Sequence, residues 1–343
     1  MITFVAVKTK LTKMNKTAFL LVALMGMALQ SHAIDNNTVE IVYSGTTATV
    51  SVASNISSYV TVSSGTSSHV VITQNESFAG VDKTTDNEDG EIYYVLSGSS
   101  SDGEFKLTGS YKCEIDLKGL TLTNPSGPAL NIQNGKRIII SAKNGTTSTL
   151  TDAANDDFNG CIHVKGHTKL KGKGTLNVVG MSKHAVYSKE YVEVKNITLN
   201  ITAAKKDGIH CKEYFLMESG TVSISGVGDD GIQCELDGTT STGTTADHED
   251  EDSGNFYMEK GTLTISSYGG KAIKTDGTIT YSGGTQNFDT SDTLINGIDA
   301  VKASRNAEGV TVYDLSGRRV GNAGTKGVYI VNKEGRTYKV IAK

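Results

Sequence analysis

Two nearly identical hexapeptides place aspartate directly before glycine: KDGIHC at residues 206–211 and DDGIQC at residues 229–234. Asp207 and Asp230 occupy the same place in the two copies, and Asp229 adds a third carboxylate. Carboxylate oxygens gathered at a turn are the ligands that Ca²⁺ takes, at about 2.3–2.6 Å. We therefore expect Asp207, Asp229 and Asp230 to bind calcium, although Asp-Gly alone is also an ordinary turn signal. Asp157, which follows Asp156, is a further candidate metal ligand.

These hexapeptides belong to a longer repeat, with weaker copies GPALNI (127–132), NGCIHV (159–164), KHAVYS (183–188) and GKAIKT (270–275). The apolar anchors Val186, Ile209 and Ile232 recur at one constant interval, whereas an insertion at 237–254 lengthens the next interval, from Ile232 to Ile273. A repeat period in the twenties is typical of solenoids.

The rest of each repeat also aligns without a gap, as YVEVKNITLNI, YFLMESGTVSI and NFYMEKGTLTI show. Alternation at period two would turn every second residue inward and stack like residues, for example Val192, Phe215 and Phe256. We therefore predict an all-β parallel β-helix. A β-sandwich is the alternative, but it has no reason to keep like residues in register at a constant spacing.

The N-terminal segment, the hydropathy and the charge balance indicate which class of protein this is. Residues 1–33 combine Lys16, the apolar run 18–29 and the ending Ser-His-Ala, a pattern typical of a cleaved secretory signal peptide. No other apolar stretch is long enough to cross a bilayer, so no membrane span is expected. Removing the leader's four lysines leaves 29 basic residues against 37 acidic ones, which disfavours nucleic acid as a partner.

Four cysteines in a secreted chain of this size do not make a disulfide scaffold: Cys113, Cys161, Cys211 and Cys234. Cys211 and Cys234 occupy the same repeat position. Stacked parallel side chains point the same way, which fits disulfide geometry poorly. We expect buried thiols that pack as small apolar groups.

The segments DGIHCKEYFLMESGTVSI, GVGDDGIQCE and GKAIKTDGTITYSGGT resemble a family of secreted bacterial carbohydrate-binding β-helix proteins with repeated DGI motifs. The resemblance implies a right-handed parallel β-helix similar to pectate lyases, bound Ca²⁺, and binding of cellulose or acidic polysaccharide. It implies a protein that is secreted, extracellular or at the outer cell surface, and we expect a monomer. The segment GVTVYDLSGRRV with KGVYIVNKEGRTYKVI resembles C-terminal sorting or adhesion domains of secreted Bacteroidetes proteins.

These patterns predict five parts: the signal peptide 1–33, an N-terminal β cap at 34–95, the β-helix at 96–287, a linker at 288–299 and a small C-terminal β domain at 300–343. Solenoid ends need such caps.

The residue after each anchor should point outward and line a surface strip: Asn131, His163, Tyr187, His210, Gln233 and Lys274. Planar and hydrogen-bonding side chains in a row would suit an extended glycan, and Tyr191 and Tyr214 at the next turn would extend the strip. An ordinary polar surface ladder is the alternative.

Enzymatic function stays open as an alternative to binding. A lyase acting on uronate glycans needs a base, for which Lys206, Lys212 and Lys274 near the DGI turns are candidates. The sequence GDDGI resembles the aspartate pair of polygalacturonases, but the Gly-His-Gly and Arg-Ile-Lys segments of those hydrolases do not occur. A structural or adhesive surface protein is the third possibility.

Overall fold

The computed structural model describes residues 34–75, 91–236, 238 and 252–289, and four C-terminal strands at 310–314, 319–320, 327–333 and 336–342. Regular structure in these residues is β, apart from one 3-10 turn, η1 (Ser54–Ile56). No helix among them could span a lipid bilayer. The predicted signal peptide and, within the insertion, residues 237 and 239–251 lie outside the described residues.

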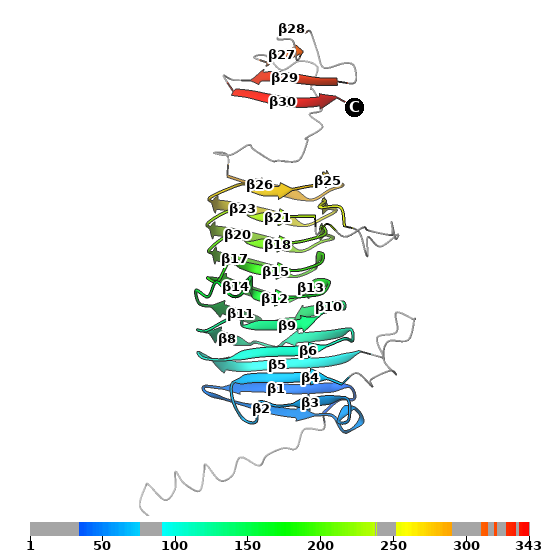
Figure 1. Ribbon diagram of the computed structural model, residues 1–343, viewed down its shortest axis with the longest axis vertical. Helices are drawn as coiled ribbons and strands as arrows, with labels where there is room; N and C mark the ends of the chain where they lie inside the picture. The colour runs from blue at the N-terminus through cyan, green and yellow to red at the C-terminus, as the bar shows by residue number, and fades with distance from the viewer. Residues whose placement is uncertain are drawn as a thin grey trace, which may run out of the picture. The chain divides into compact units, whose positions relative to one another are not determined.

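Between Cys113 and Thr275, the described chain repeats three short strands per coil, and the coils stack (Figure 1). The first strands of the coils form the first face: β7 (Cys113–Leu117), β10 (Ile138–Ala142), β13 (Thr168–Gly172), β16 (Val192–Lys195), β19 (Phe215–Met217) and β22 (Phe256–Met258). The second strands form the second face: β8 (Thr121–Asn124), β11 (Thr147–Asp152), β14 (Thr175–Gly180), β17 (Thr198–Ala204), β20 (Thr221–Val227) and β23 (Thr262–Tyr268). The third strands form the third face: β9 (Leu130–Asn134), β12 (Gly160–Val164), β15 (His184–Ser188), β18 (Ile209–Cys211), β21 (Ile232–Cys234) and β24 (Ile273–Thr275).

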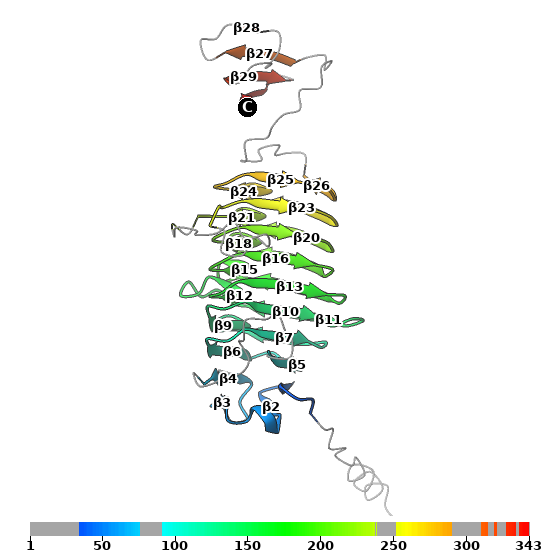
Figure 2. The same cartoon turned by 90° about the vertical axis from the view of Figure 1, so that its right-hand side faces the viewer.

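Strands before and after these coils continue the faces. β5 (Ile92–Ser100) pairs in parallel with both β7 and β8, which joins the first and second faces into one sheet. The third face continues through β6 (Glu104–Gly109) and β4 (His69–Gln74) to β3 (Val60–Val62). β1 (Thr38–Ser44) forms an antiparallel hairpin with β2 (Thr47–Val52) and also pairs in parallel with β5. β25 (Ile279–Tyr281) and β26 (Thr285–Phe288) extend the first and second faces (Figure 2).

The C-terminal strands form a separate antiparallel sheet: β27 (Val310–Asp314), β28 (Arg319–Val320), β29 (Gly327–Lys333) and β30 (Arg336–Ala342). The architecture is therefore all-β, with long parallel sheets wound as a solenoid. The right-handed winding, the capping role of the N-terminal strands and the domain boundaries stay predictions.

The pairing register agrees with the sequence alignment of the repeats. Ile209 lies between Val186 and Ile232, and the long insertion still leaves Ile232 opposite Ile273. The inward ladder Val192, Phe215 and Phe256 is fully buried, and the two phenylalanine rings stack with centroids 5.1 Å apart. Each large side chain buried in this way contributes roughly 1.5–3 kcal/mol, so every coil adds a similar increment of stability.

Glycines allow the coils to approach one another at the corners. Gly220, where the first face turns into the second, has a φ of +104°, a left-handed conformation that side chains rarely adopt. Gly208, in the DGI motif, has a different role. A Cβ there would lie 2.6 Å from the Gly231 carbonyl oxygen and 2.6 Å from Ile224 Cγ2, so this glycine is required by close packing between coils.

The four cysteines are buried free thiols, in agreement with the expectation for Cys211 and Cys234. Cys211 lies opposite Cys234 in the parallel ladder. Burial raises the pKa of the Cys211 thiol well above its ordinary value, which keeps the thiol protonated and unreactive.

Candidate functional site

The DGI aspartates lie at the corner where the second face turns into the third. Because Ile209 pairs with Ile232, the residues two positions earlier, Asp207 and Asp230, occupy adjacent coils. The Asp230 backbone N–H donates a 3.0 Å hydrogen bond to Asp207 Oδ1, and both side chains are almost fully buried. The predicted stacking of these carboxylates is therefore present in the structure.

Asp229 and Asp230 converge on the backbone of the next coil. A Cβ placed on Gly270 would lie 2.5 Å from Asp230 Oδ1 and 2.6 Å from Asp229 Oδ1, so the missing side chain leaves a small space beside the two carboxylates. Asp207, Asp229 and Asp230 can each place one carboxylate oxygen within 4.8 Å of the others. Three hard oxygen donors at this spacing fit the ligand preference of Ca²⁺.

The electrostatics of Asp230 also favour a cation. Burial raises the pKa of its carboxyl group, and the charges of Asp207 and Asp229 add to the rise, while the Lys271 backbone N–H and the Lys274 ammonium oppose it. Oδ1 accepts a 2.8 Å hydrogen bond from Lys271 N–H. Oδ2 is buried and accepts no hydrogen bond from the described residues, and the Lys274 Nζ atom lies 3.3 Å away. A buried anionic oxygen supported by one partly exposed lysine is costly, and a metal ion beside it would stabilise it further.

Asp207 has a different environment. Burial would raise the pKa of this carboxyl group, but hydrogen bonds from His184 and His210 outweigh burial and hold the pKa well below its ordinary value. Hydrogen bonds to the charged form of a carboxyl group favour that form. Asp207 therefore remains ionised under all ordinary conditions.

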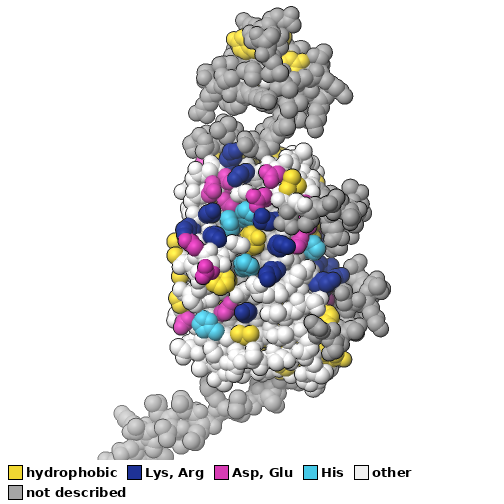
Figure 3. Space-filling model, in the orientation of Figure 1, with side chains coloured by type: hydrophobic (Ala, Val, Ile, Leu, Met, Phe, Trp, Pro, Cys, Tyr) yellow, Lys and Arg dark blue, Asp and Glu magenta, His cyan; other side chains and the backbone are white. Residues whose placement is uncertain are grey.

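The predicted surface strip lies on the third face, which Figure 3 shows toward the viewer with charged and histidine side chains gathered over its upper coils. His163, Tyr187 and His210 are consecutive in the register, with ring centroids 5.2 and 5.6 Å apart. Their residues are only 8–9% exposed, because each ring covers its neighbour. The strip thus offers ring edges to a ligand instead of an open stacking face. Gln233 and Lys274, which continue the row, are partly exposed.

The prediction that Tyr191 and Tyr214 extend the strip is wrong, because both residues are fully buried. Their rings stack on each other at 4.9 Å, and the Tyr214 hydroxyl lies 3.1 Å from Glu193 Oε1. At the corner between the third and first faces they cluster with Leu216, which points away from the inward ladder, so outward-facing neighbours cover both rings.

Asp157 lies apart from the three stacked carboxylates, on an exposed turn where its backbone N–H donates to Asn155 Oδ1. Its neighbour Asp156 forms an ion pair with Lys205 at 2.5 Å. Asp157 does not join a metal-compatible group within the described part of the chain.

Two of the three candidate lysine bases, Lys212 and Lys274, are engaged by carboxylates. Lys212 Nζ lies 3.0 Å from Glu235 Oε2. For Lys274, burial lowers the pKa, but the nearby Asp230 carboxylate outweighs burial and raises the pKa above its ordinary value. A lysine with a raised pKa stays protonated at neutral pH and is a poor proton acceptor. Lys206 lies at the corner, where its carbonyl accepts the Asp229 backbone N–H.

Two residues of this corner were not among the predicted site residues. His184 occupies the same repeat position as Asp207, and its Nδ1 atom lies 3.1 Å from Asp207 Oδ2. Glu235 Oε2 lies 3.2 Å from His210 Nε2. The alignment of KHAVYS with KDGIHC places His184 at the repeat position of Asp207 and Asp230, which we call the aspartate column. A search for metal ligands at that position would have found His184.

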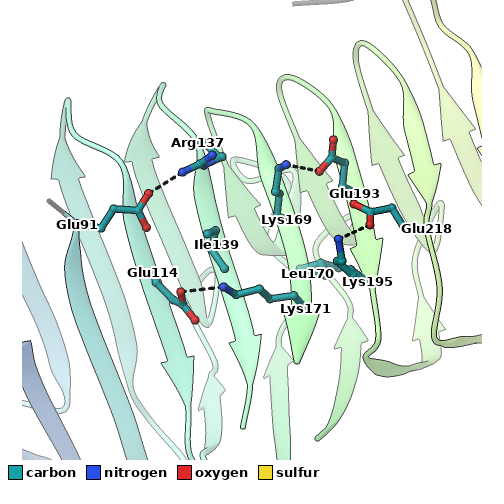
Figure 4. A pocket seen from close by; sticks show the side chains of 10 residues that line it. All are labelled: Glu91, Glu114, Arg137, Ile139, Lys169, Leu170, Lys171, Glu193, Lys195 and Glu218. Carbon is teal, nitrogen blue, oxygen red and sulfur yellow. Dashed lines mark hydrogen bonds and ion pairs between the residues drawn. The ribbon is translucent and has the colours of Figure 1, made fainter. Parts of the chain in front are cut away.

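A shallow hollow of about 370 Å³ lies on the first face (Figure 4). Its basic side chains are matched by acidic ones from other coils, at 2.5–3.0 Å: Arg137 with Glu91, Lys171 with Glu114, Lys169 with Glu193 and Lys195 with Glu218. Since its charges are neutralised locally, this hollow favours neither anionic nor cationic ligands. The corner of the third face is the better candidate site.

Comparison with known proteins agrees with this fold. A solved structure described as a polysaccharide lyase-like protein from C. thermocellum, gadolinium derivative, matches with a TM-score of 0.53 and 19% identity, covering 73% of this chain and 99% of that chain. At this identity the likeness concerns the fold alone. No curated protein matches significantly. The model of the carbohydrate-binding domain-containing protein family matches residues 82–316, and because this is more than half of the sequence, the chain belongs to that family.

Proposed function

We propose that this protein is a secreted or cell-surface protein that binds polysaccharide in a calcium-dependent way and does not catalyse a reaction on it. The glycan class that fits best is acidic, such as a polyuronate, with a β-linked neutral glycan as the other possibility. Family membership supports carbohydrate binding. Calcium dependence and ligand class are inferred from the corner of the third face.

The observation that carries the proposal is the convergence of Asp229 and Asp230 beside Gly270, where the buried Asp230 Oδ2 has the partly exposed Lys274 ammonium at 3.3 Å as its partner. Asp229 and Asp230 would hold the ion, with Asp207 within reach. Calcium would supply a hard positive charge to which carboxylate and hydroxyl oxygens of a glycan can bind. Asp229 is partly exposed, so the ion would be accessible from solvent.

The third face would contribute the remaining glycan contacts. Lys274 has a partly exposed side chain beside the aspartates, where it can pair with a uronate carboxylate. Gln233 precedes it in the same row and can hydrogen-bond sugar hydroxyls. The edges of His163, Tyr187 and His210 continue the row across three coils. An extended chain is thus a better fit than a small compact sugar.

Lack of catalysis is inferred from the lysines. A lyase needs an unprotonated base near the uronate C5 proton, yet Lys274 pairs with Asp230 and Lys212 pairs with Glu235. Incubation of the protein with polygalacturonate and calcium tests this inference. We expect no rise in ultraviolet absorbance from unsaturated uronide, and a sustained rise that depends on the protein would establish the lyase alternative.

Secretion is inferred from the leader-like pattern at 1–33, and surface attachment from the resemblance of the C-terminal segment to sorting domains. Recovery of the chain from culture medium or the outer cell surface, with the segment 1–33 removed, tests both.

Calorimetry tests the main proposal. Short oligogalacturonides, which calcium does not gel, are titrated into the full chain with calcium and then with a chelator. Binding is expected only with calcium, and Asp230→Asn is expected to abolish most of it. Asp102→Asn, at an exposed residue that pairs with His69, is the control. Equal heats with calcium and with chelator, or unchanged binding by Asp230→Asn, would contradict the proposal.

A further inference from the structure

Two histidines converge on one carboxylate oxygen next to the proposed calcium site. His184 begins β15 and His210 lies in β18 on the next coil, and their ring centroids are 4.4 Å apart. The Nδ1 atoms of the two rings lie 3.1 and 2.9 Å from the same atom, Asp207 Oδ2. This arrangement arises because His184 occupies the aspartate column one coil before Asp207.

The chemistry of these donors differs from that of the calcium site. Ca²⁺ takes oxygen ligands, whereas imidazole nitrogen suits Zn²⁺, Cu²⁺ and Ni²⁺. Ligands about 2.0–2.2 Å from one such ion lie about 3 Å from each other, which is the spacing found here. We propose that His184, His210 and Asp207 form a binding site for one borderline divalent metal ion, such as Zn²⁺, through two imidazole nitrogens and one carboxylate oxygen.

The hydrogen bonding of His184 supports a cation at this point. Its Nδ1 atom faces two groups of Asp207, the backbone nitrogen at 3.3 Å and Oδ2 at 3.1 Å. Nδ1 can accept the backbone N–H or donate a proton to Oδ2, but it cannot do both. A metal ion between Nδ1 and Oδ2 would hold these two atoms together without a proton on the ring nitrogen.

The surroundings of His210 match those of a metal-binding histidine. Its second nitrogen, Nε2, lies 3.2 Å from Glu235 Oε2. Metal-binding histidines commonly donate the other ring N–H to a carboxylate, which fixes the tautomer and the ring orientation. Glu235 is itself held by Lys212 at 3.0 Å. Glu235 is therefore assigned as a positioning residue, and its 36% exposed side chain marks the solvent side of the site.

The two cation sites share one residue and are otherwise distinct. Asp207 Oδ2 faces the histidines, while Asp207 Oδ1 accepts the Asp230 backbone N–H on the calcium side. His184 and His210 take no part in the oxygen cluster of Asp229 and Asp230. In calcium-free buffer, zinc binding can therefore be measured apart from calcium and glycan binding, and each site can fail without the other.

Zinc calorimetry on the full chain, made without a polyhistidine tag and in calcium-free buffer, tests the site. One saturable zinc ion per chain is expected. His184→Gln and His210→Gln are each expected to weaken zinc binding by at least about 100-fold, and Glu235→Gln by about 10–100-fold. His167→Gln is the matched control, since His167 lies 3.7 Å from Glu213 in a separate histidine–carboxylate group at another corner.

Asp229→Asn separates the two cation sites. This variant is expected to weaken calcium binding and to leave zinc binding unchanged. If Asp229→Asn weakens zinc as much as His184→Gln does, zinc occupies the acidic cluster and the proposal is wrong. Absence of one saturable zinc ion on the wild-type chain would also overturn it.

Spectroscopy of the wild-type chain keeps the test decisive if the histidine variants fail to fold. X-ray absorption of the zinc-loaded protein is expected to show two imidazole ligands, and Co²⁺ is expected to give the visible absorption of a site with nitrogen and oxygen donors. A spectrum with oxygen donors alone would overturn the proposal.

Discussion

Gly270→Ala tests the calcium site without changing any charge. Gly270 lacks a positive φ, so an alanine backbone is acceptable there, but its Cβ would lie 2.5 Å from Asp230 Oδ1 and 2.6 Å from Asp229 Oδ1. A usual close C···O contact is about 3.3 Å, so each oxygen would have to move by roughly 0.7–0.8 Å. That displacement is several times the tolerance of about 0.2 Å for metal–ligand distances. We expect calcium affinity to fall at least tenfold, which corresponds to about 1.4 kcal/mol.

Calcium calorimetry on Gly270→Ala, with the shift in thermal midpoint on adding calcium, measures the effect. Gly135→Ala is the control, because a Cβ at Gly135 meets no atom within 4 Å. Gly135→Ala should retain calcium binding, whereas Gly270→Ala should lose most of the calcium-induced rise in melting temperature. If Gly270→Ala folds and binds calcium as tightly as the wild type, the ion does not lie beside Asp229 and Asp230.

Three further predictions follow from the described contacts. Burial and, to a lesser extent, the charges of Lys165 and Lys183 lower the pKa of His163 to about 4. The imidazole is therefore protonated more readily in the unfolded chain than in the folded one. The free energy of unfolding should fall by up to about 3 kcal/mol as the pH drops from about 6.5 to about 4. Urea unfolding across that range should show a flatter pH dependence for His163→Gln, and parallel curves would contradict the assignment. Phe256→Ala removes a fully buried ring and should lower the free energy of unfolding in urea by about 3–5 kcal/mol. A loss of less than about 1 kcal/mol would contradict this prediction. Lys274→Gln should weaken oligogalacturonide binding about tenfold in calorimetry, whereas the exposed Lys118→Gln should not, and equal affinities would remove Lys274 from the glycan contacts.

The stacking of coils could be predicted from the sequence because it depends on one repeated property. An inward residue at a fixed spacing must lie over its counterpart in the next coil, since any slip would expose apolar side chains on every strand. Ile209 and Ile232 illustrate this rule. The same reasoning placed Ile273 correctly despite the preceding insertion, because extra residues at a corner leave the strands in register.

Burial at the corners could not be predicted in this way. Tyr191 and Tyr214 directly precede first-face strands and cluster with Leu216 on the outward side of those strands. Tyr191 stacks on His167, with ring centroids 4.5 Å apart, and on Tyr214, so neighbouring side chains on the outer side bury both rings. Alternation predicts which side of a sheet a side chain faces, but it does not predict whether outward neighbours will cover that side chain.

The aspartate column explains why one corner can favour two kinds of cation. Successive coils present His184, Asp207 and Asp230 at the same position, so the donor changes from nitrogen to oxygen within two coil spacings. Parallel stacking forces these side chains together regardless of charge, and like carboxylates in adjacent coils repel each other. At Asp207 two imidazoles relieve that repulsion, which leaves Asp230 with the less supported oxygen. A hard ion such as Ca²⁺ should therefore bind on the Asp230 side of this corner, and a borderline ion such as Zn²⁺ on the His184 side. Asp207 serves both sides because Oδ1 faces Asp230 and Oδ2 faces His184.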